Sequence, residues 1–397
     1  MKPVIIVGTG LAGYTVAREF RKLDTATPLI IVTADDGGFY SKPMLSNAFA
    51  LGKGASQLVT QAASQLAAQL NATVLTATLV KYIDAANKTI ATSAGDYEYG
   101  KLVLATGARP IRLALEGDAA EDVISVNHVG DYAYFRARLA AARRHVTILG
   151  AGLIGCEFAD DLAGAGYGVT LVDPNPVPLA ALAAPALSEG LHAALSTRGV
   201  TMRLGTTATR VDRNGEALRV TLADGSSFDT GVVLSAVGLR ADLSLAQSAQ
   251  LKTGRGITVD RRGQTSAEDV FAVGDGAEYA CEDGSARALP YIAPLMTAAR
   301  AIARTLAGHP TDIELKPAPV IVKTPSFPLA LVPPPPEVAA AGQWHTQVDG
   351  PHTICRFYDA QGVMRGFGVA PQEAGKRQQL LAELGGAQTA LRPTLPA

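Results

Sequence analysis

Cysteine is scarce in this chain, and its spacing is as informative as its number. The 397 residues include three cysteines, Cys156, Cys281 and Cys355, which form neither a CxxC motif nor another close pair. This spacing excludes a local redox-active dithiol and a metal cluster ligated by cysteine. Cys156 is expected to be a small, buried apolar residue. The six histidines show no metal-like or triad-like spacing, and no metal site is predicted.

Excess charge and long apolar runs are also lacking. Lys and Arg number 35 against 36 Asp and Glu, a formal net charge of −1, which gives no reason to expect nucleic acid or an anionic membrane as a partner. No apolar stretch is long enough to span a bilayer, and the first strand begins too early to leave room for a signal peptide. We therefore expect a cytoplasmic protein. The absence of a cysteine pair that could link two subunits permits the monomer that we expect.

Glycine, by contrast, is abundant, and two stretches place it in the same pattern. Residues 4–13 read VIIVGTGLAG and residues 146–155 read VTILGAGLIG. In each stretch a β-branched strand meets a turn whose first glycine allows a tight bend, whose second lets the backbone approach a pyrophosphate, and whose third lets a helix pack on the strand. The glycines are Gly8, Gly10 and Gly13 in the first stretch and Gly150, Gly152 and Gly155 in the second. Each helix N-terminus would then face a phosphate.

Two such elements predict two bound dinucleotides, and the usual pair is a nicotinamide and a flavin that exchange a hydride. Asp35 ends the strand after the first helix and is our first choice for the adenosine ribose, with Asp36 second; a loop-capping role is the alternative for either. Asp173 has the corresponding place in the second half. No arginine follows it in residues 174–176 to accept a 2′-phosphate, so NADH is favoured over NADPH.

Other segments support two similarly built α/β domains. Residues 102–110 (LVLATGARP) and 231–239 (GVVLSAVGL) are buried strands that end in glycine at a similar distance after each glycine loop. Residues 55–70 are predicted to be helical, and a helix over residues 293–306 has Pro294 in its first turn. Asp275 ends a last strand, where it could bind flavin ribityl hydroxyls or form a plain turn.

The order of the motifs GTGLAG, YSKPMLS, LATGARP, GAGLIGCEFA, SAVGLR, FAVGDGAE and LPYIAPLM resembles the FAD-dependent pyridine nucleotide–disulfide reductases. Within that superfamily, YSKPMLS together with GAGLIGCEF, PLMTAARAIARTLAG and VKTPSFPL is similar to the NADH:rubredoxin reductases. The resemblance implies an α/β fold with two Rossmann-like domains, in which an inserted NAD domain interrupts the FAD domain, and a small C-terminal α/β domain. The implied limits are 1–112 and 245–312 for the FAD domain, 113–244 for the NAD domain and 313–397 for the C-terminal domain.

The resemblance also implies which residues bind the two cofactors, with Glu157 near flavin N5 and the nicotinamide, and with Glu157 and Lys42 as the catalytic pair of charges. The FAD contacts would be Gly8, Gly10, Leu11, Ala12, Gly13, Asp35, Lys42, Pro43, Thr106, Arg109, Asp275, Pro294 and Lys323. The NADH contacts would be Gly150, Gly152, Ile154, Gly155, Glu157, Asp173 and Gly238.

Two positions depart from the pattern of the ferredoxin-reducing relatives. Those proteins have a lysine after LS, paired with the glutamate, where this chain has Asn47. Lys42 or Lys323 could supply that charge instead. Those relatives also place a tryptophan in the C-terminal segment, where this chain has VKTPSFP.

The function expected from these observations is hydride transfer from NADH to FAD, followed by single-electron transfer to rubredoxin. A weak contact with this small acidic acceptor could use Lys42, Arg109 and Arg300. The alternatives are a ferredoxin reductase of an oxygenase system and a reductase for a rubredoxin-like protein in nitric oxide detoxification. A flavin-bound protein whose redox state switches a binding partner is a further alternative from a different class.

Overall fold

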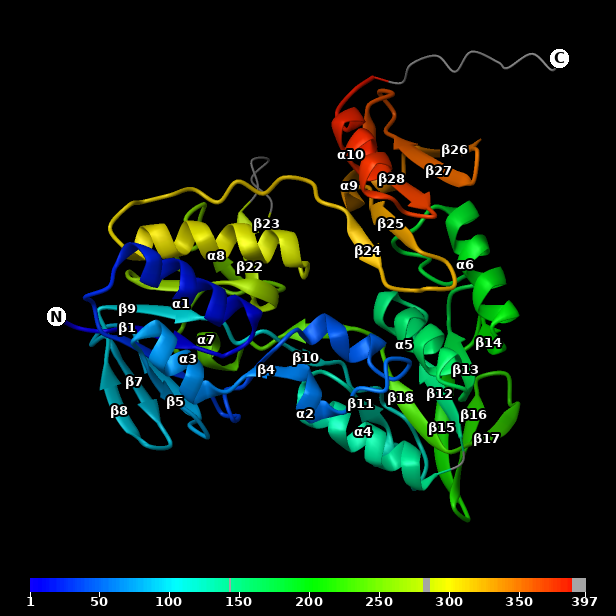
Figure 1. Ribbon diagram of the computed structural model, residues 1–397, viewed down its shortest axis with the longest axis horizontal. Helices are drawn as coiled ribbons and strands as arrows, with labels where there is room; N and C mark the ends of the chain where they lie inside the picture. The colour runs from blue at the N-terminus through cyan, green and yellow to red at the C-terminus, as the bar shows by residue number, and fades with distance from the viewer. Residues whose placement is uncertain (143, 281–285, 388–397) are drawn as a thin grey trace.

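The computed structural model describes residues 1–142, 144–280 and 286–387. Figure 1 shows three bodies: one around the N-terminus, a second below and beside it, and a smaller third that ends near the C-terminus. The first two each contain a five-stranded parallel sheet, and the third contains a five-stranded antiparallel sheet. The expected class, two Rossmann-like α/β units with a small C-terminal α/β unit, is confirmed. The domain limits given above stay a prediction.

The first body has the sheet order β21-β9-β1-β2-β5. Its strands are largely apolar and buried, apart from the partly exposed edge strand β5, and α1 (Leu11–Leu23) packs against α8 (Ile292–Leu306). Because β21 and α8 come from the far side of the inserted second body, the chain leaves this sheet and returns to it. The strands are β1 (Val4–Val7), β2 (Leu29–Val32), β5 (Thr73–Leu75), β9 (Lys101–Leu104) and β21 (Val270–Ala272). Two small sheets flank it: β6 (Val80–Asp84), β7 (Thr89–Thr92) and β8 (Gly95–Glu98), and β20 (Ile257–Val259), β22 (Ala277–Ala280) and β23 (Ala286–Ala288).

The second body repeats the plan with the sheet order β11-β18-β12-β13-β14. Two short strands, β10 (Ala108–Pro110) and β19 (Leu239–Ala241), pair antiparallel where the chain crosses between the bodies. The strands of the sheet are β11 (Ile124–Ser125), β12 (His145–Leu149), β13 (Gly168–Asp173), β14 (Val200–Leu204) and β18 (Val232–Ser235). The helices are α4 (Val129–Ala141), α5 (Leu153–Gly164) and α6 (Pro185–Thr197), and a meander follows as β15 (Ala208–Asn214), β16 (Ala217–Leu222) and β17 (Ser227–Thr230).

The third body has the sheet order β24-β25-β28-β27-β26. In Figure 1 a long connection from the end of α8 crosses to β24. The sheet packs on the second body, because Phe327 lies against α6: a Cβ added at Gly190 would lie 2.5 Å from the tip of that ring. The elements are β24 (Val320–Val322), β25 (Leu329–Val332), α9 (Pro336–Ala339), β26 (Gln343–Asp349), β27 (His352–Tyr358), β28 (Met364–Ala370) and α10 (Ala374–Glu383).

The continuous helix predicted over residues 55–70 is wrong. The segment forms α2 (Ala55–Leu58), a strand β4 (Val59–Gln61) and α3 (Ala63–Leu70). Val59 and Gln61 of β4 pair with Tyr40 and Phe39 of β3 (Phe39–Tyr40). This pairing, with the β-branched Val59 and Thr60 favouring a strand, overrides the helical pattern on either side. The 3-10 helix η1 (Lys42–Asn47) follows β3 and leads toward the second body.

Candidate active site

The first glycine loop joins β1 to α1 and is tightly packed at two of its three glycines. Gly8 has φ +113°, and a Cβ added there would lie 2.3 Å from the Ala105 carbonyl oxygen. A Cβ at Gly13 would lie 2.0 Å from the Gly8 carbonyl oxygen. At Gly10, in contrast, a Cβ would meet no described atom within 4 Å, and no described side chain caps α1. The open backbone and the free N–H groups of the helix therefore fit a pyrophosphate.

The second glycine loop joins β12 to α5 and repeats this geometry. Gly150 has φ +106°, and a Cβ there would lie 2.7 Å from the Ala236 carbonyl oxygen. A Cβ at Gly155 would lie 1.8 Å from the Gly150 carbonyl oxygen. A Cβ at Gly152, in contrast, would meet no described atom within 4 Å. No described side chain caps α5, and the apolar Ile154 in its first turn is exposed. A second dinucleotide fits here for the same reason, with an apolar surface beside it.

Asp35 lies at the exposed end of β2 and keeps one carboxylate oxygen free. Its Oδ1 accepts hydrogen bonds from Thr33 Oγ1 at 2.6 Å and from the Gly37 N–H at 2.9 Å. Its Oδ2 has no hydrogen bond with a described residue. Among the described residues, Asp36 accepts only from the Gly38 N–H, at 3.0 Å. Both residues form loop turns, and the free oxygen of Asp35 is also available to a ribose hydroxyl.

Asp173 lies at the end of β13, as predicted, but both of its oxygens are used within the protein. Its Oδ2 accepts from the Ala151 N–H at 2.7 Å, inside the second glycine loop. Its Oδ1 accepts from the backbone and side-chain nitrogens of Asn175, each at 2.8 Å. The buried carboxylate therefore fixes the shape of the glycine loop, a role that the strand-end position alone did not indicate.

Asp275 and the N-terminus of α8 lie together beside the first glycine loop. Asp275 lies in the turn η3 (Gly274–Gly276), and a Cβ at Gly276 would lie 3.4 Å from Thr106 Oγ1. Asp275 makes no hydrogen bond or ion pair with a described residue. The helix α8, with Pro294 in its first turn, packs on both α1 and η3, and no described side chain caps it. A free carboxylate and a free helix N-terminus thus face the same region.

Lys42 begins η1 and is close to acidic groups. Burial lowers the pKa of Lys42, and the charges of Asp275 and Asp131 oppose this shift. Lys42 makes no hydrogen bond or ion pair with a described residue. This cation therefore lies on the Asp275 side of the site and is not the partner of Glu157.

Lys323, from the third body, is the lysine that pairs with Glu157. Glu157 is fully buried on α5, and its Oε2 lies 2.5 Å from Lys323 Nζ and accepts from Ser46 Oγ at 2.6 Å. Its Oε1 accepts from the Lys323 backbone N–H at 2.9 Å. Lys323 Nζ also donates to Asn47 Oδ1 at 2.8 Å and to the Pro43 carbonyl at 2.7 Å. The three bodies meet at this pair.

Sequence reasoning missed part of this cluster. Ser46 joins Glu157 to Lys323, although the motif YSKPMLS alone assigns it no role. Asn47 stands where ferredoxin-reducing relatives have a lysine, and here its side-chain oxygen accepts from Lys323 while its nitrogen donates to the Lys323 carbonyl at 2.8 Å. The signal that could have found both residues is their position directly after the KPML segment, which has to run toward the glutamate on α5.

Gly238 and Arg109 lie where the chain crosses between the first two bodies. Gly238 has φ +112°, and its carbonyl accepts from the Ile111 N–H at 3.1 Å. Arg109 Nη2 lies 2.7 Å from Asp242 Oδ2, which reduces its use as a docking cation. Arg300, on α8, is exposed and has no ion pair with a described residue.

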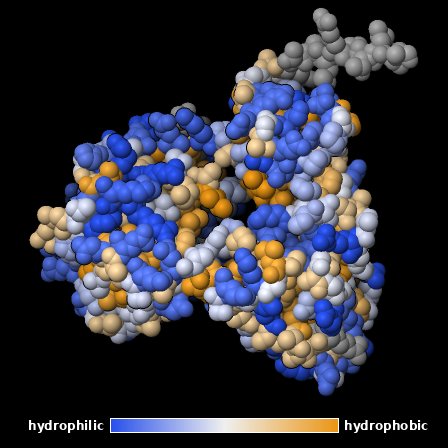
Figure 2. Space-filling model, viewed as in Figure 1, coloured by the Kyte–Doolittle hydropathy of each residue, from blue (hydrophilic) through white to orange (hydrophobic). Residues whose placement is uncertain are grey.

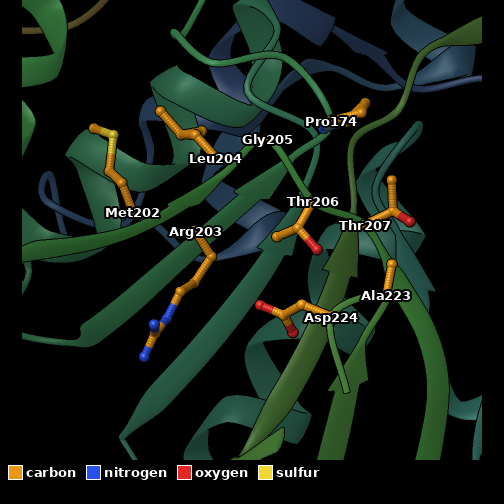
Figure 3. Close-up of a pocket in the computed structure, with 9 residues that line it drawn as sticks. All are labelled: Pro174, Met202, Arg203, Leu204, Gly205, Thr206, Thr207, Ala223 and Asp224. Carbon is orange, nitrogen blue, oxygen red and sulfur yellow. The ribbon is translucent and has the colours of Figure 1, made fainter. Parts of the chain in front are cut away.

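A pocket of about 650 Å³ opens beside the end of β13 and is lined by Pro174, residues 202–207, Ala223 and Asp224. In Figure 3 the guanidinium of Arg203, from the neighbouring strand β14, points away from Pro174. Hydrogen bonds from Ser226 lower the pKa of Asp224, and the charge of Arg203 adds to this effect. Arg203 lies outside residues 174–176 because it comes from the next strand, where it pairs with Val172, so the sequence around Asp173 does not indicate it.

Figure 2 shows a hollow in the middle of the visible face, with hydrophobic residues along its rim; in the matching view of Figure 1 it lies between α8 and β24. Within the described ranges, no helix is long and apolar enough to cross a bilayer, and no three His, Cys, Asp or Glu side chains are grouped as metal ligands. Cys156 is fully buried, as expected, and both Cys156 and Cys355 are free thiols. Cys281 lies outside the described residues.

This geometry agrees with comparisons with known proteins. Residues 2–303 match the pyridine nucleotide-disulphide oxidoreductase family, and the chain belongs to that family. Membership implies FAD and NAD(H) as the cofactors, and the open glycine loops at Gly10 and Gly152 fit both of them. Residues 312–384 match the rubredoxin binding C-terminal domain.

Individual relatives are similar over nearly their whole length. The rubredoxin-NAD(+) reductase of Alcanivorax borkumensis is 42% identical, over 97% of this chain and 99% of that protein. The nitric oxide reductase FlRd-NAD(+) reductase of Aeromonas hydrophila is 37% identical, over 96% of each chain. Among solved structures, a ferredoxin reductase from Rhodopseudomonas palustris superposes with a TM-score of 0.88 at 25% identity, covering 98% of this chain and 96% of that one.

Proposed function

We propose that this chain is an NADH-dependent flavoprotein reductase that delivers single electrons to rubredoxin. The observation that carries the proposal is the presence of two open glycine loops, one in each Rossmann-like body, together with the ion pair of the buried Glu157 and Lys323 where the three bodies meet. The rubredoxin-NAD(+) reductases among the relatives and the match of residues 312–384 to a rubredoxin binding domain support this acceptor.

FAD, when bound, supplies the chemistry, because it accepts a hydride and releases electrons one at a time. The residues of this chain would bind and orient the two cofactors and would set the electrostatic environment of the flavin. The N–H groups at Gly10 and Gly152 would hold the two pyrophosphates, and Asp275 would hold ribityl hydroxyls. Lys323, held in place by Glu157 and Asn47, would put a fixed positive charge beside the ring system, which favours the electron-rich reduced form. No side chain needs to act as nucleophile, general acid or general base.

We propose NADH as the preferred donor. The carboxylate of Asp173 lies next to the second glycine loop, where it would repel the 2′-phosphate of NADPH. Arg203, the cation among the residues that line the pocket, points away from Pro174, and the charges of Arg203 and Asp224 interact. We therefore expect kcat/KM to be at least about tenfold higher with NADH than with NADPH. This ratio corresponds to a difference of roughly 1.4 kcal/mol in transition-state free energy between the two donors. Equal values would contradict this assignment.

The test of the function is a bleaching experiment with the FAD-loaded protein. Anaerobic NADH should remove the yellow flavin absorbance, and oxidised rubredoxin should restore it. Added salt should slow the second step, because the contact with an acidic acceptor is screened, and Arg300→Gln should weaken that salt dependence. A protein that cannot be loaded with FAD, or whose flavin stays oxidised under excess NADH, would refute the proposal.

A second candidate acceptor is a rubredoxin-like domain of a nitric oxide detoxification system. The relative from Aeromonas hydrophila, named for that pathway, supports it. A ferredoxin of an oxygenase system is the third candidate. The same bleached protein offered each acceptor in turn separates them by the rate of reoxidation. Slow bleaching with a long-lived charge-transfer band, and no fast acceptor, would instead favour a redox-switched binding role.

A further inference from the structure

The helix α5 carries two more buried carboxylates beside Glu157. Asp160 and Asp161 follow it by three and four residues, a spacing that places all three on one face of the helix. Asp160 is fully buried and Asp161 is 5% exposed. Three carboxylates in one turn repel one another and lose their hydration, so burial there is costly unless each one has hydrogen-bond donors or a cation beside it.

Asp160 holds the same segment of the third body that carries Lys323. Its Oδ2 accepts from the Ser326 N–H at 3.0 Å. Its Oδ1 lies 3.1 Å from Arg198 Nε in an ion pair, but it accepts no hydrogen bond from a described residue. The segment is itself a closed turn, because the Phe327 N–H donates to the Thr324 carbonyl at 2.9 Å. The Lys323 N–H donates to Glu157, and the Ser326 N–H donates to Asp160. Two carboxylates of α5 therefore hold this turn.

Asp161 holds the segment of the first body that carries Ser46 and Asn47. Its two oxygens accept from the Phe49 N–H at 2.8 Å and from the Ala50 N–H at 3.1 Å. These donors lie just past the end of η1. Asp161 has no ion pair with a described residue. Burial raises its pKa, and the hydrogen bonds from Phe49 and Ala50 oppose this shift without cancelling it.

The carboxylates on α5 do something that apolar side chains in the same places could not do. Leucine side chains on α5 would bring the same segments together at lower electrostatic cost, but they would not fix the direction of a backbone N–H group. A carboxylate oxygen that accepts from a backbone N–H fixes the segment in position and orientation. The row Glu157, Asp160 and Asp161 thus aligns both segments that surround Lys323 Nζ.

We propose that Asp160 and Asp161 are positioning residues, which set the place of Lys323 relative to the flavin by fixing the 323–327 turn and the 46–50 segment on α5. The inference rests on the proposed function, since it assigns Lys323 a place beside the flavin. Neither aspartate touches the cofactor in this assignment, and each acts through Lys323.

The test compares Asp160→Asn and Asp161→Asn in the FAD-loaded full chain with a matched control. An amide has one acceptor oxygen and no charge. Asp160→Asn therefore removes the ion pair with Arg198, and Asp161→Asn leaves one of its two N–H partners without an acceptor. Asp359→Asn is the control: Asp359 is 7% exposed and also uses both oxygens, for the Gln361 and Val363 N–H groups and for Arg365, but it lies in the β27–β28 turn. All three variants should lose thermal stability.

The readout that a merely structural role would not change is the rate constant of flavin reduction by NADH in stopped-flow experiments. We expect it to fall about tenfold in Asp160→Asn and Asp161→Asn, with a shift of the flavin absorption band, and to stay at the wild-type value in Asp359→Asn. Equal FAD content in all samples ensures that the comparison concerns positioning. Unchanged rate constants and spectra in the two α5 variants would overturn the inference.

A second measurement checks that the aspartates act through the lysine. In a Lys323→Met background, adding Asp160→Asn should cause less than a twofold further loss of the rate constant, because the group being positioned is gone. A further tenfold loss would show that Asp160 acts by another route and would overturn the inference. A wild-type flavin that NADH cannot reduce at all would instead count against the proposed function.

Discussion

The ion pair of Glu157 and Lys323 yields a quantitative prediction, because its two members are buried to different extents. Glu157 is 0% exposed, whereas the Lys323 side chain is 31% exposed and keeps Pro43 and Asn47 as hydrogen-bond acceptors. Lys323→Met leaves a buried carboxylate without its cation, which costs about 3–5 kcal/mol. We take about 3, since Glu157 still accepts from Ser46 and from a backbone N–H. Glu157→Gln leaves a satisfied, partly hydrated lysine and should cost about 1 kcal/mol.

These free energies convert to melting temperatures. At an unfolding entropy of about 2.1 cal/mol/K per residue, a chain of 397 residues gives about 0.8 kcal/mol/K. Differential scanning calorimetry should therefore show a fall of roughly 4 °C for Lys323→Met and roughly 1 °C for Glu157→Gln. The double variant Glu157→Gln/Lys323→Met should melt above Lys323→Met alone, because the unpaired charge is removed.

A matched control separates the pair from any loss of a lysine. Lys376 has a side chain that is 20% exposed, but its partner Asp349 is 53% exposed and stays hydrated without it. Lys376→Met should cost less than about 1 kcal/mol. A loss equal to that of Lys323→Met, or a double variant that melts below both single variants, would refute the reasoning from the buried carboxylate.

Three further predictions concern single positions. Burial lowers the pKa of Lys42 in the folded protein. The flavin-free wild type should therefore lose stability relative to Lys42→Met as the pH falls through that lowered pKa, because folding then has to bury a charged lysine. Thermal melts at pH 7 and 10.5 should show a smaller difference in melting temperature at the higher pH. Gly10→Ala should leave the melting temperature near wild type but weaken FAD binding about tenfold in fluorescence titrations. Gly8→Ala should instead unfold the domain, because its Cβ would lie 2.3 Å from the Ala105 carbonyl oxygen. Gly152→Ala should raise the KM for NADH and leave the FAD content unchanged, and loss of FAD from this variant would contradict the assignment of the second loop.

The local elements of the fold could be predicted from the sequence because their causes are local. A β-branched run that meets glycines at fixed spacing requires a positive φ at the first glycine and close helix packing at the third, and both are found at Gly8 and Gly13 and again in the second loop. The helix predicted over residues 55–70 failed, because the partner of β4 lies at Phe39–Tyr40, outside the window of any helical pattern.

The assembly of the site was decided by the tertiary structure. Whether Lys42 or Lys323 pairs with Glu157 could not be read from the chain, since Lys323 is 166 residues away and reaches α5 only because the third sheet packs on the second body. The same holds for Arg203, which enters its pocket from a neighbouring strand, and for Asp160, which looks like an ordinary helical acid until the 323–327 turn meets it. The sequence by itself determined the shape of the two open glycine loops, because glycine spacing controls the backbone directly. Which charged side chains pair with one another near the loops depended on packing between distant segments, because a side chain finds its partner only after the sheets have been brought together.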